Sequence, residues 1–175
     1  MKTLKKLILC AALIMPMLFF GQSAFDKFDG RDDITAVIVN KKMFQMMGKV
    51  DSKDKETQQY LNLIQKLDNL RVFTTTNDKT TAELKSAAEK YIKTSGLEEL
   101  MRVNDKGKNI RIMIKSGAKE SQVRELLMFI EGSGKDDTVL MSLTGDFDLN
   151  EISILTDKMN LPGGDVLSKG TKGRK

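Results

Sequence analysis

Two acidic residues, Asp146 and Asp148, are the first candidates for chemistry, because with Asn150 they alternate as the ligands of a calcium loop do. That loop needs glycine where Glu151 stands and a bidentate glutamate where Asp157 stands. Helix capping and turn formation therefore explain these side chains better. A weak surface cation site is the alternative.

Three methionines, Met43, Met46 and Met47, are the second candidate, because thioether sulfur is a ligand for monovalent copper. No histidine is present to complete such a site. Methionine also fills irregular gaps in a core, and with Phe44 these residues fit one or two helical turns that end at Gly48. The sequence favours core packing for them.

Serine and lysine lie three residues apart at Ser52 and Lys55, and again at Ser116 and Lys119, which is the spacing of some acylating enzymes. Both pairs fall in predicted polar loops, where nothing would desolvate the lysine into a neutral base. Residues 132–135, Gly-Ser-Gly-Lys, lack two of the residues that a phosphate-binding loop requires. These patterns do not indicate an enzyme.

The 175 residues include no histidine, and the single cysteine, Cys10, lies in an N-terminal apolar run. Ser-His-Asp and Cys-His catalysis are therefore excluded, and the mature chain has no thiolate ligand and no disulfide. We expect no cofactor and no metal. The domain must be stabilised by burial of apolar side chains.

Residues 1–21 are organised as a secretory signal peptide, with a basic start, an apolar run over residues 7–20 and small or polar residues after it. The run contains Pro16 and is shorter than the roughly 20 residues of a spanning helix, so no transmembrane helix is expected in the mature chain. Cys10 lies too early in the run to be the acylated cysteine of a lipoprotein. We expect an exported protein of the periplasm or envelope, without a lipid anchor.

The formal charge of +5 is partly a property of this leader, whose removal leaves 26 basic and 24 acidic residues. A near-neutral chain disfavours nucleic-acid binding, which needs a concentrated basic surface. Residues 162–175 have breakers and charges with little apolar content, which predicts a disordered basic tail. Residues 22–161 are long enough for a single domain.

The clearest local pattern is residues 136–159, which predict a strand that ends at Gly145 and a helix with Asp148 and Glu151 as a capping box. Residues 34–39 are apolar nearly throughout, which predicts a strand covered on both faces. Residues 77–81 supply helix caps, with Thr80 and Glu83 at capping-box spacing, and predict a helix around residues 84–92. Other patterns predict a helix over residues 57–67 and strands over residues 70–76, 97–103, 110–114, 123–130 and 138–144.

These elements predict a single α+β domain in the order strand, helix, strand, helix, four strands, helix. We expect a mixed or antiparallel sheet of about six strands, the last four forming an antiparallel meander. The helices are expected to pack mainly on one face of the sheet.

Several segments together resemble the exported bacterial family catalogued as domain of unknown function 4252. They are the leader, ITAVIVNKKMFQMM, LDNLRVFTT and MSLTGDFDLNEISIL, and the resemblance spans about residues 25–159. It implies export to the periplasm or envelope of Gram-negative bacteria of the Bacteroidetes type. Many members look like lipoproteins, and this sequence departs from them because no cysteine follows its apolar run. The family has no assigned catalytic residues to carry over.

We therefore expect a non-catalytic envelope protein that binds another envelope protein or a surface component. The alternative is a small periplasmic hydrolase or metal-handling protein that uses carboxylates or methionines. A concave pocket that gathers Asp, Glu or Lys side chains with shifted pKa values would favour the enzyme. An exposed apolar patch or an unpaired sheet edge would favour the binding module.

Overall fold

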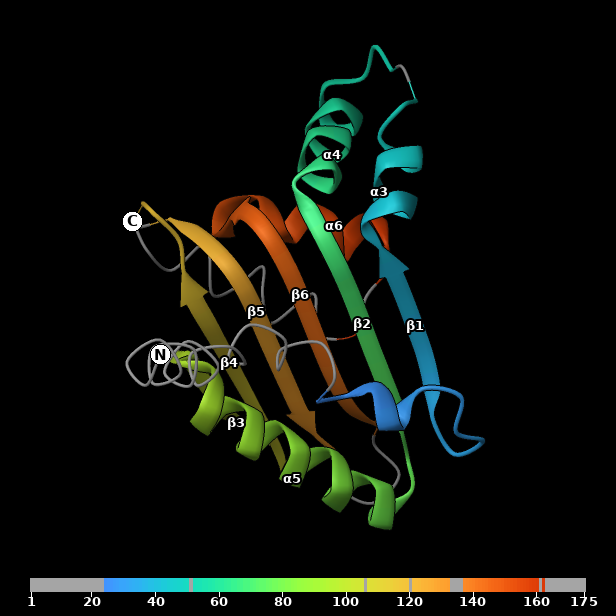
Figure 1. Cartoon of the computed structure of the whole chain (residues 1–175), viewed down its shortest axis with the longest axis vertical. Helices are drawn as coiled ribbons and strands as arrows, with labels where there is room; N and C mark the ends of the chain where they lie inside the picture. Colours follow the sequence, from blue (N-terminus) through green and yellow to red (C-terminus); the bar gives the residue numbers. More distant parts are fainter. Residues whose placement is uncertain are drawn as a thin grey trace, which may run out of the picture.

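One antiparallel sheet organises the residues that the structure, a computed structural model, describes: 24–50, 52–105, 107–119, 121–132, 137–160 and 162. Within these residues six strands lie in the order β1-β2-β6-β5-β4-β3 (Figure 1). The last four strands are neighbours in both sequence and space, so the predicted meander is confirmed. The strands are β1 (Thr35–Asn40), β2 (Leu67–Thr75), β3 (Glu98–Asp105), β4 (Lys108–Ser116), β5 (Gln122–Glu131) and β6 (Thr138–Asp148).

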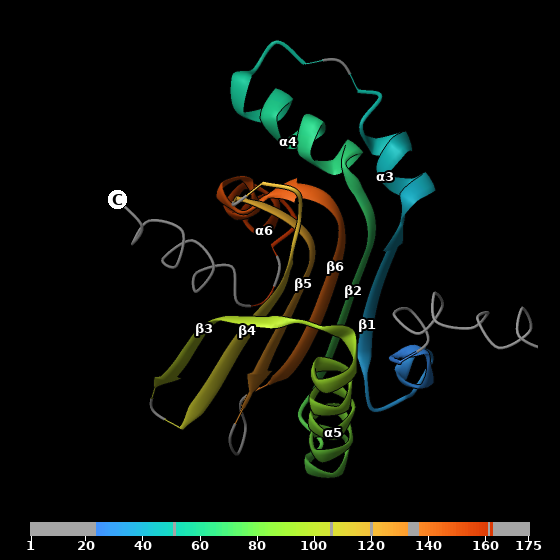
Figure 2. The same cartoon turned by 60° about the vertical axis from the view of Figure 1, so that its left-hand side comes forward.

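The helices lie on both faces of this sheet, and Figure 1 shows α5 in front of the strands and α6 behind them. Three of the four described α-helices, α3, α4 and α6, contribute to one core cluster, while α5 and the 3-10 helix η1 contribute to the other. Figure 2 shows α3 and α4 side by side beyond one end of the sheet. The predicted α+β class is confirmed. The helices are α3 (Lys41–Met47), α4 (Lys55–Gln65), α5 (Asp78–Ser95), α6 (Ile152–Lys158), η1 (Asp26–Phe28) and η2 (Leu149–Glu151).

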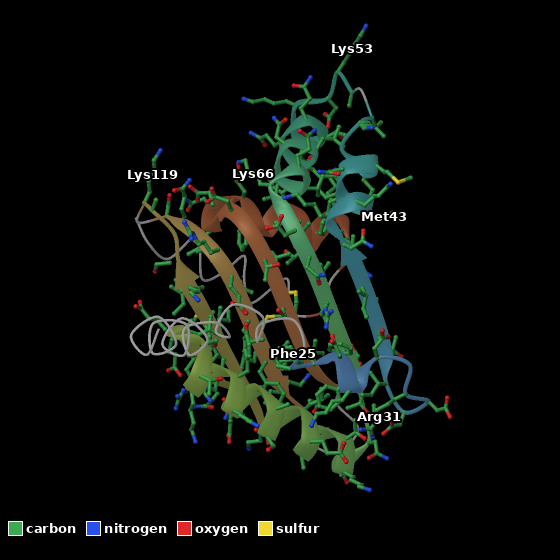
Figure 3. The ribbon with its side chains drawn as sticks, in the orientation of Figure 1. Phe25, Arg31, Met43, Lys53, Lys66 and Lys119 are labelled. Carbon is green, nitrogen blue, oxygen red and sulfur yellow. The ribbon has the colours of Figure 1, made fainter. Side chains whose placement is uncertain are left out.

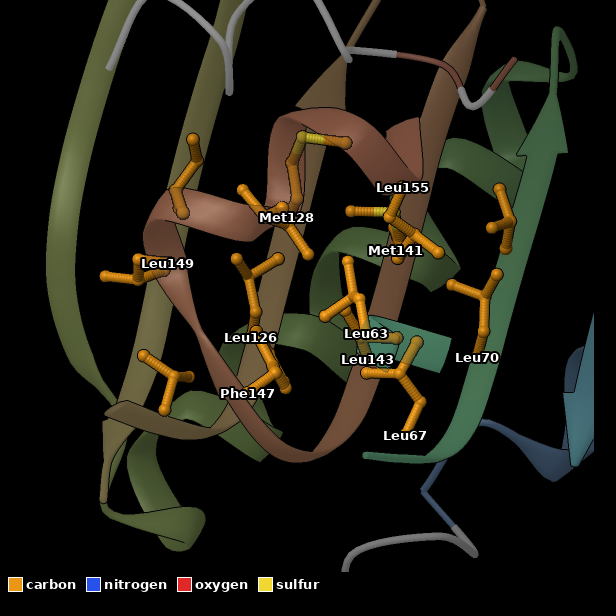
Figure 4. Close-up of a cluster of buried hydrophobic side chains, with 14 of the residues drawn as sticks. Leu63, Leu67, Leu70, Leu126, Met128, Met141, Leu143, Phe147, Leu149 and Leu155 are labelled. Atoms are coloured by element: carbon orange, nitrogen blue, oxygen red, sulfur yellow. The ribbon is translucent and has the colours of Figure 1, made fainter. Parts of the chain in front are cut away.

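Leucine and isoleucine make up most of the first core cluster, which lies between the sheet and α3, α4 and α6 (Figure 4). Full burial of one such side chain contributes about 1.5–3 kcal/mol to folding. The second cluster, under α5, is rich in aromatic rings. Fully buried leucines of the first cluster are Leu63, Leu67, Leu70, Leu126, Leu143 and Leu155, and the rings of the second are Phe25, Phe28, Phe73, Tyr91 and Phe129.

The sequence prediction is wrong about the burial of β1. The apolar pattern predicts a strand covered on both faces. In the structure the first four residues of β1, Thr35 to Ile38, are all exposed. The reason is position: β1 pairs with β2 alone and forms one edge of the described sheet. An apolar, β-branched run does not reveal whether its strand is central or at an edge.

β6 also differs from its prediction, because it does not end at Gly145 but continues to Asp148. Gly145 lies against the start of β2, where a Cβ atom would come within 2.5 Å of the carbonyl oxygen of Lys66. Glycine therefore permits a close approach of the two paired backbones here. Asp148 caps the following helical segment as predicted, accepting the N–H of Asn150 at 2.8 Å. The predicted capping box is wrong, because Glu151 pairs instead with the ammonium group of Lys66.

α5 begins earlier than its apolar stripe indicated. Its N-cap is Asn77, the first residue of the predicted capping segment, and its side chain accepts the N–H of Thr80 at 3.1 Å. The predicted capping box of Thr80 and Glu83 is wrong, because the Glu83 carboxylate pairs with Arg31. Thr80 lies fully buried in the first turn instead. At the other end Gly96 adopts a φ of +68°, which ends the helix as predicted. α4 likewise starts two residues before the prediction, after the cap Asp54, and Leu67 already belongs to β2.

Three predicted features lie outside the described residues: the signal peptide at 1–21, most of the loop at 132–135, and the basic tail after residue 162.

Candidate functional site

The outer side of β1 is the most distinctive surface of the fold. Its sequence, TAVIVN, has no charged residue, and its register with β2 is regular throughout. Val37 and Ile38 are 43% and 40% exposed on opposite faces of the strand. No described strand pairs with its outer side. Such an edge presents free backbone donors and acceptors to a further strand.

The opposite edge, β3, is built differently. It carries the charged residues Glu98, Glu99 and Arg102, and the guanidinium group of Arg102 lies 2.6 Å from the Glu99 carboxylate. Its register with β4 shifts between Glu99 and Met101. Charges and bulges are the features by which proteins prevent pairing at an exposed edge. The fold therefore protects one edge of the sheet and leaves the other open.

α3 extends the open surface beyond the end of β1. Asn40, the last residue of β1, accepts the N–H of Met43 at 3.0 Å and so turns the chain directly from strand into helix. Phe44 is then fully buried, while Met43 and Met46 are 49% and 59% exposed. Figure 3 shows Met43 projecting from α3 toward the side of the molecule that β1 borders. We call the exposed side chains of Val37, Ile38, Met43 and Met46 the β1–α3 surface.

The methionines are thus divided between surface and core. Met47 packs against the first core cluster, as the sequence favoured, but core packing is wrong for Met43 and Met46. As a candidate metal site the trio is split, because Met47 turns inward while the other two turn outward. On the surface, exposed methionines are adaptable apolar contacts.

An open groove of about 320 Å³ lies between α4 and the segment that follows α3. The Gln65 side chain donates to the carbonyl oxygen of Gly48 at 2.9 Å, and the Gln58 side chain donates to that of Ser52 at 2.7 Å. These two amide groups of α4 thus hold the segment that follows α3 in place. The Ser52 hydroxyl accepts the N–H of Asp54 at 3.2 Å. The described residues that line the groove carry no charge: Gly48, Val50, Ser52, Gln58, Leu61, Asn62 and Gln65.

The acidic residues singled out from the sequence lie on β6. Asp146 is exposed, and Asp148 accepts hydrogen bonds from the Ser121 hydroxyl at 2.6 Å and from Asn150. Hydrogen bonds from Ser121 and Asn150 lower the pKa of Asp148 against the opposing effect of burial, which is the largest single influence. Among the described residues no three acidic side chains gather in a way that would hold a metal ion. The observed role of Asp148 is capping.

A buried pair that the sequence analysis missed lies under α5. The Tyr91 hydroxyl donates to Glu125 at 2.6 Å, and both residues are less than 10% exposed. Burial raises the pKa of the Glu125 carboxyl, and burial together with this hydrogen bond raises the pKa of Tyr91. Glu125 alternates regularly with Leu127 and Phe129, so its side chain lies on the face of β5 that α5 covers. The register shift precedes it, where Arg124 is exposed and Val123 belongs to the other core cluster. The available signal was one carboxylate inside an apolar strand.

A second cluster of charges ties the chain before β1 to the first turn of α5. The Arg31 guanidinium lies 2.9 Å from Asp33 and 2.5 Å from Glu83. The Thr80 hydroxyl also donates to Asp33. These bonds lower the pKa of Asp33 to about 2, chiefly through Arg31. Thr80 and Glu83, expected to cap the helix, therefore join distant segments instead.

The geometry thus separates two kinds of feature. The groups with shifted pKa values lie in a core cluster, in ion pairs or in caps, whereas the groove is lined by uncharged residues. In the described part of the chain, no helix combines the length and the apolar character needed to cross a membrane. The prominent exposed apolar feature is the β1–α3 surface.

Comparison with known proteins gives one match. The family model described as Domain of unknown function (DUF4252) matches residues 28–155, from η1 to α6, and so includes the whole sheet. No curated protein and no solved structure matches the chain.

Proposed function

This chain belongs to the DUF4252 family, and from its own surface we propose that it is an exported, non-catalytic envelope protein that binds a protein partner by strand addition at β1. In strand addition, an extended segment pairs with a free sheet edge through main-chain hydrogen bonds, and exposed side chains provide specificity. β1 offers this combination.

One observation carries the proposal: the two edges of the same sheet are treated differently. β3 has charges and a register shift, while β1 has neither over its six residues. An open apolar edge favours unwanted pairing, so proteins that do not use such an edge usually block it. The exposed Met43 and Met46 add apolar area beside it.

The alternative, a carboxylate- or methionine-dependent hydrolase or metal-handling protein, has less support. An acid or base must reach a substrate, and Glu125, whose pKa is raised by burial, is covered by α5 and bonded to Tyr91. The groove brings no charged described residue to its lining. These placements favour binding over bond cleavage.

Export is part of the proposal and rests on the leader pattern of residues 1–21. Mass spectrometry of the protein recovered from cell fractions reads its mature N-terminus directly. An N-terminus near residue 22 in the envelope or periplasmic fraction supports export. An intact N-terminus in the cytoplasmic fraction contradicts it.

The binding surface is tested by photo-crosslinking in cells. A photoreactive phenylalanine analogue is placed at Ile38 in one strain and at Leu100 in another. Leu100 is the matched control, because it is 38% exposed on the opposite edge strand. We expect protein adducts from position 38 and few from position 100. Equal adducts at both positions, or turnover of ester, peptide or glycan substrates by the purified protein, would contradict the proposal.

A further inference from the structure

We infer that the strand that adds to β1 is β1 of a second copy of this chain, so that two sheets join in an antiparallel homodimer. This inference rests on the proposed function, because it names the partner of the same edge. Its argument comes from the charges at the two ends of β1 and from the pattern of its exposed side chains.

The two ends of β1 carry opposite charges. Asp32 and Asp33 stand just before the strand, and Lys41 and Lys42 stand just after it. Antiparallel pairing of two identical strands brings the acidic end of each copy beside the basic end of the other, twice by symmetry. Parallel pairing would place like charges together. Charge complementarity of this kind determines orientation and suppresses wrong pairings.

Two of these four residues are available for such contacts. Asp33 already binds Arg31, and Lys41 lies 2.7 Å from Asp68. Asp32 and Lys42 are both exposed, and in the described part of the chain neither has a hydrogen-bond or ion-pair partner. The contact between Asp32 of one copy and Lys42 of the other is therefore the specific one.

The apolar side chains fit the same arrangement. In an antiparallel pair, directly opposite residues point to the same face, so a two-fold axis through the joint must pass through a residue that faces itself. With Val37 on the axis, Ala36 faces Ile38 of the second copy and Thr35 faces Val39. This register also places position 32 level with position 42.

α3 supplies further contact area. Six residues on each strand bury less than the roughly 1,200 Å² of a stable interface. Met43 and Met46 are exposed next to the strand, and the antiparallel arrangement directs α3 of each copy toward residues 29–34 of the other. The open edge, the charges and the methionines thus act together in one interface.

Sedimentation equilibrium of the purified protein, in the form that the expressing cell yields, tests the dimer. We expect a monomer–dimer equilibrium that Ile38→Lys weakens at least about tenfold, since an edge lysine opposes strand pairing. Leu100→Lys, the matched change on β3, should leave it unchanged. Circular dichroism and urea unfolding confirm that each variant is folded.

Charge reversal tests the orientation. Asp32→Lys and Lys42→Asp should each weaken the dimer several-fold, because each places like charges together at two symmetric positions. The double variant should recover the wild-type association. A single-site loss without recovery in the double variant would refute the antiparallel register.

Cysteine crosslinking tests the position of the axis. In a Cys10→Ser background, Val37→Cys should form a disulfide-linked dimer under mild oxidation, because the two residues face each other. Thr35→Cys should not, because its counterpart lies four residues away along the strand. Equal crosslinking at both positions would overturn the inference.

The outcomes separate the two claims. A protein that stays monomeric while position 38 crosslinks to a different protein overturns the homodimer and leaves the proposed function intact. A monomer without adducts at position 38 overturns both. A dimer that resists Ile38→Lys also overturns the homodimer, since its interface then lies elsewhere.

Discussion

The Tyr91 hydroxyl donates a hydrogen bond of 2.6 Å to the Glu125 carboxyl inside the aromatic core cluster, joining α5 to β5. The ring of Tyr91 also meets Phe25 edge-on, with ring centroids 5.2 Å apart. Tyr91 of α5 therefore contacts both the sheet, at Glu125, and the N-cap residue of η1, Phe25. Burial of a carboxyl group in such a core destabilises the folded state unless the group is hydrogen-bonded.

Removal of this hydrogen bond should destabilise the fold. We expect Tyr91→Phe to lower the free energy of unfolding by about 1–3 kcal/mol, because it leaves a buried carboxyl group without its donor while the ring contact remains. Tyr60→Phe is the matched control, because no described residue hydrogen-bonds the Tyr60 hydroxyl. Urea unfolding at pH 7 measures both variants. Equal losses for the two would show that the hydrogen bond contributes nothing.

Glu125 should also make stability depend on pH. Its folded pKa lies above its ordinary value of 4.5, so the folded state retains a proton that the unfolded state has released. The wild-type protein should therefore lose stability as the pH rises from 4.5 through the folded pKa. Glu125→Gln should abolish this slope and keep the hydrogen bond from Tyr91. Unfolding midpoints between about pH 4 and pH 8 measure it, with the exposed Glu89→Gln as control. An unchanged slope in Glu125→Gln would contradict the assignment.

Asp33 should act in the opposite direction and at lower pH. Its pKa is lowered from 3.8 to about 2 by Arg31 and Thr80, so its contribution to stability is present above 3.8 and is lost as the pH falls toward 2. Asp33→Asn should flatten the acid side of the stability profile in that window. The exposed Asp29→Asn is the control. Denaturant titrations at a series of acidic pH values test this, and a slope preserved in Asp33→Asn would count against the cluster.

A side chain at Gly145 should destabilise the fold. A Cβ atom there would meet the backbone oxygen of Lys66 at 2.5 Å, and backbone at the start of β2 cannot move aside without breaking the pairing with β6. Gly145→Ala should therefore cost about 1–3 kcal/mol of stability. Gly48→Ala is the comparison: its closest neighbour, at 2.7 Å, is a side-chain carbon of Gln65, which can rotate away at the cost of its hydrogen bond to the Gly48 carbonyl oxygen, so a smaller loss is expected. Thermal unfolding compares the two variants, and a larger loss in Gly48→Ala would show that the approach of β2 to Gly145 does not limit the size of the side chain.

Local chemistry determined much of this fold. The strand of β6, the cap at Asp148, the end of α5 at Gly96 and the order of the elements follow from patterns within a few residues of each position. Such patterns depend on side-chain period, on N-cap oxygens and on the left-handed conformation that glycine allows. The absence of histidine likewise excluded Ser-His-Asp and Cys-His catalysis from the sequence alone.

Only the tertiary structure decided which surfaces are open and which charges are buried. Residues 34–39 look like a covered strand until the pairing of β2 with both β1 and β6 leaves β1 at the edge. The local sequence predicts a capping role for Thr80, but its hydroxyl donates to Asp33, forty-seven residues earlier in the chain. Glu125 shares a face of β5 with Leu127 and Phe129, and only the packing of α5 on that face shows that its carboxyl group is buried and bonded to Tyr91. Each outcome depends on contacts between segments far apart in the chain, and the local residue pattern carries no record of those contacts.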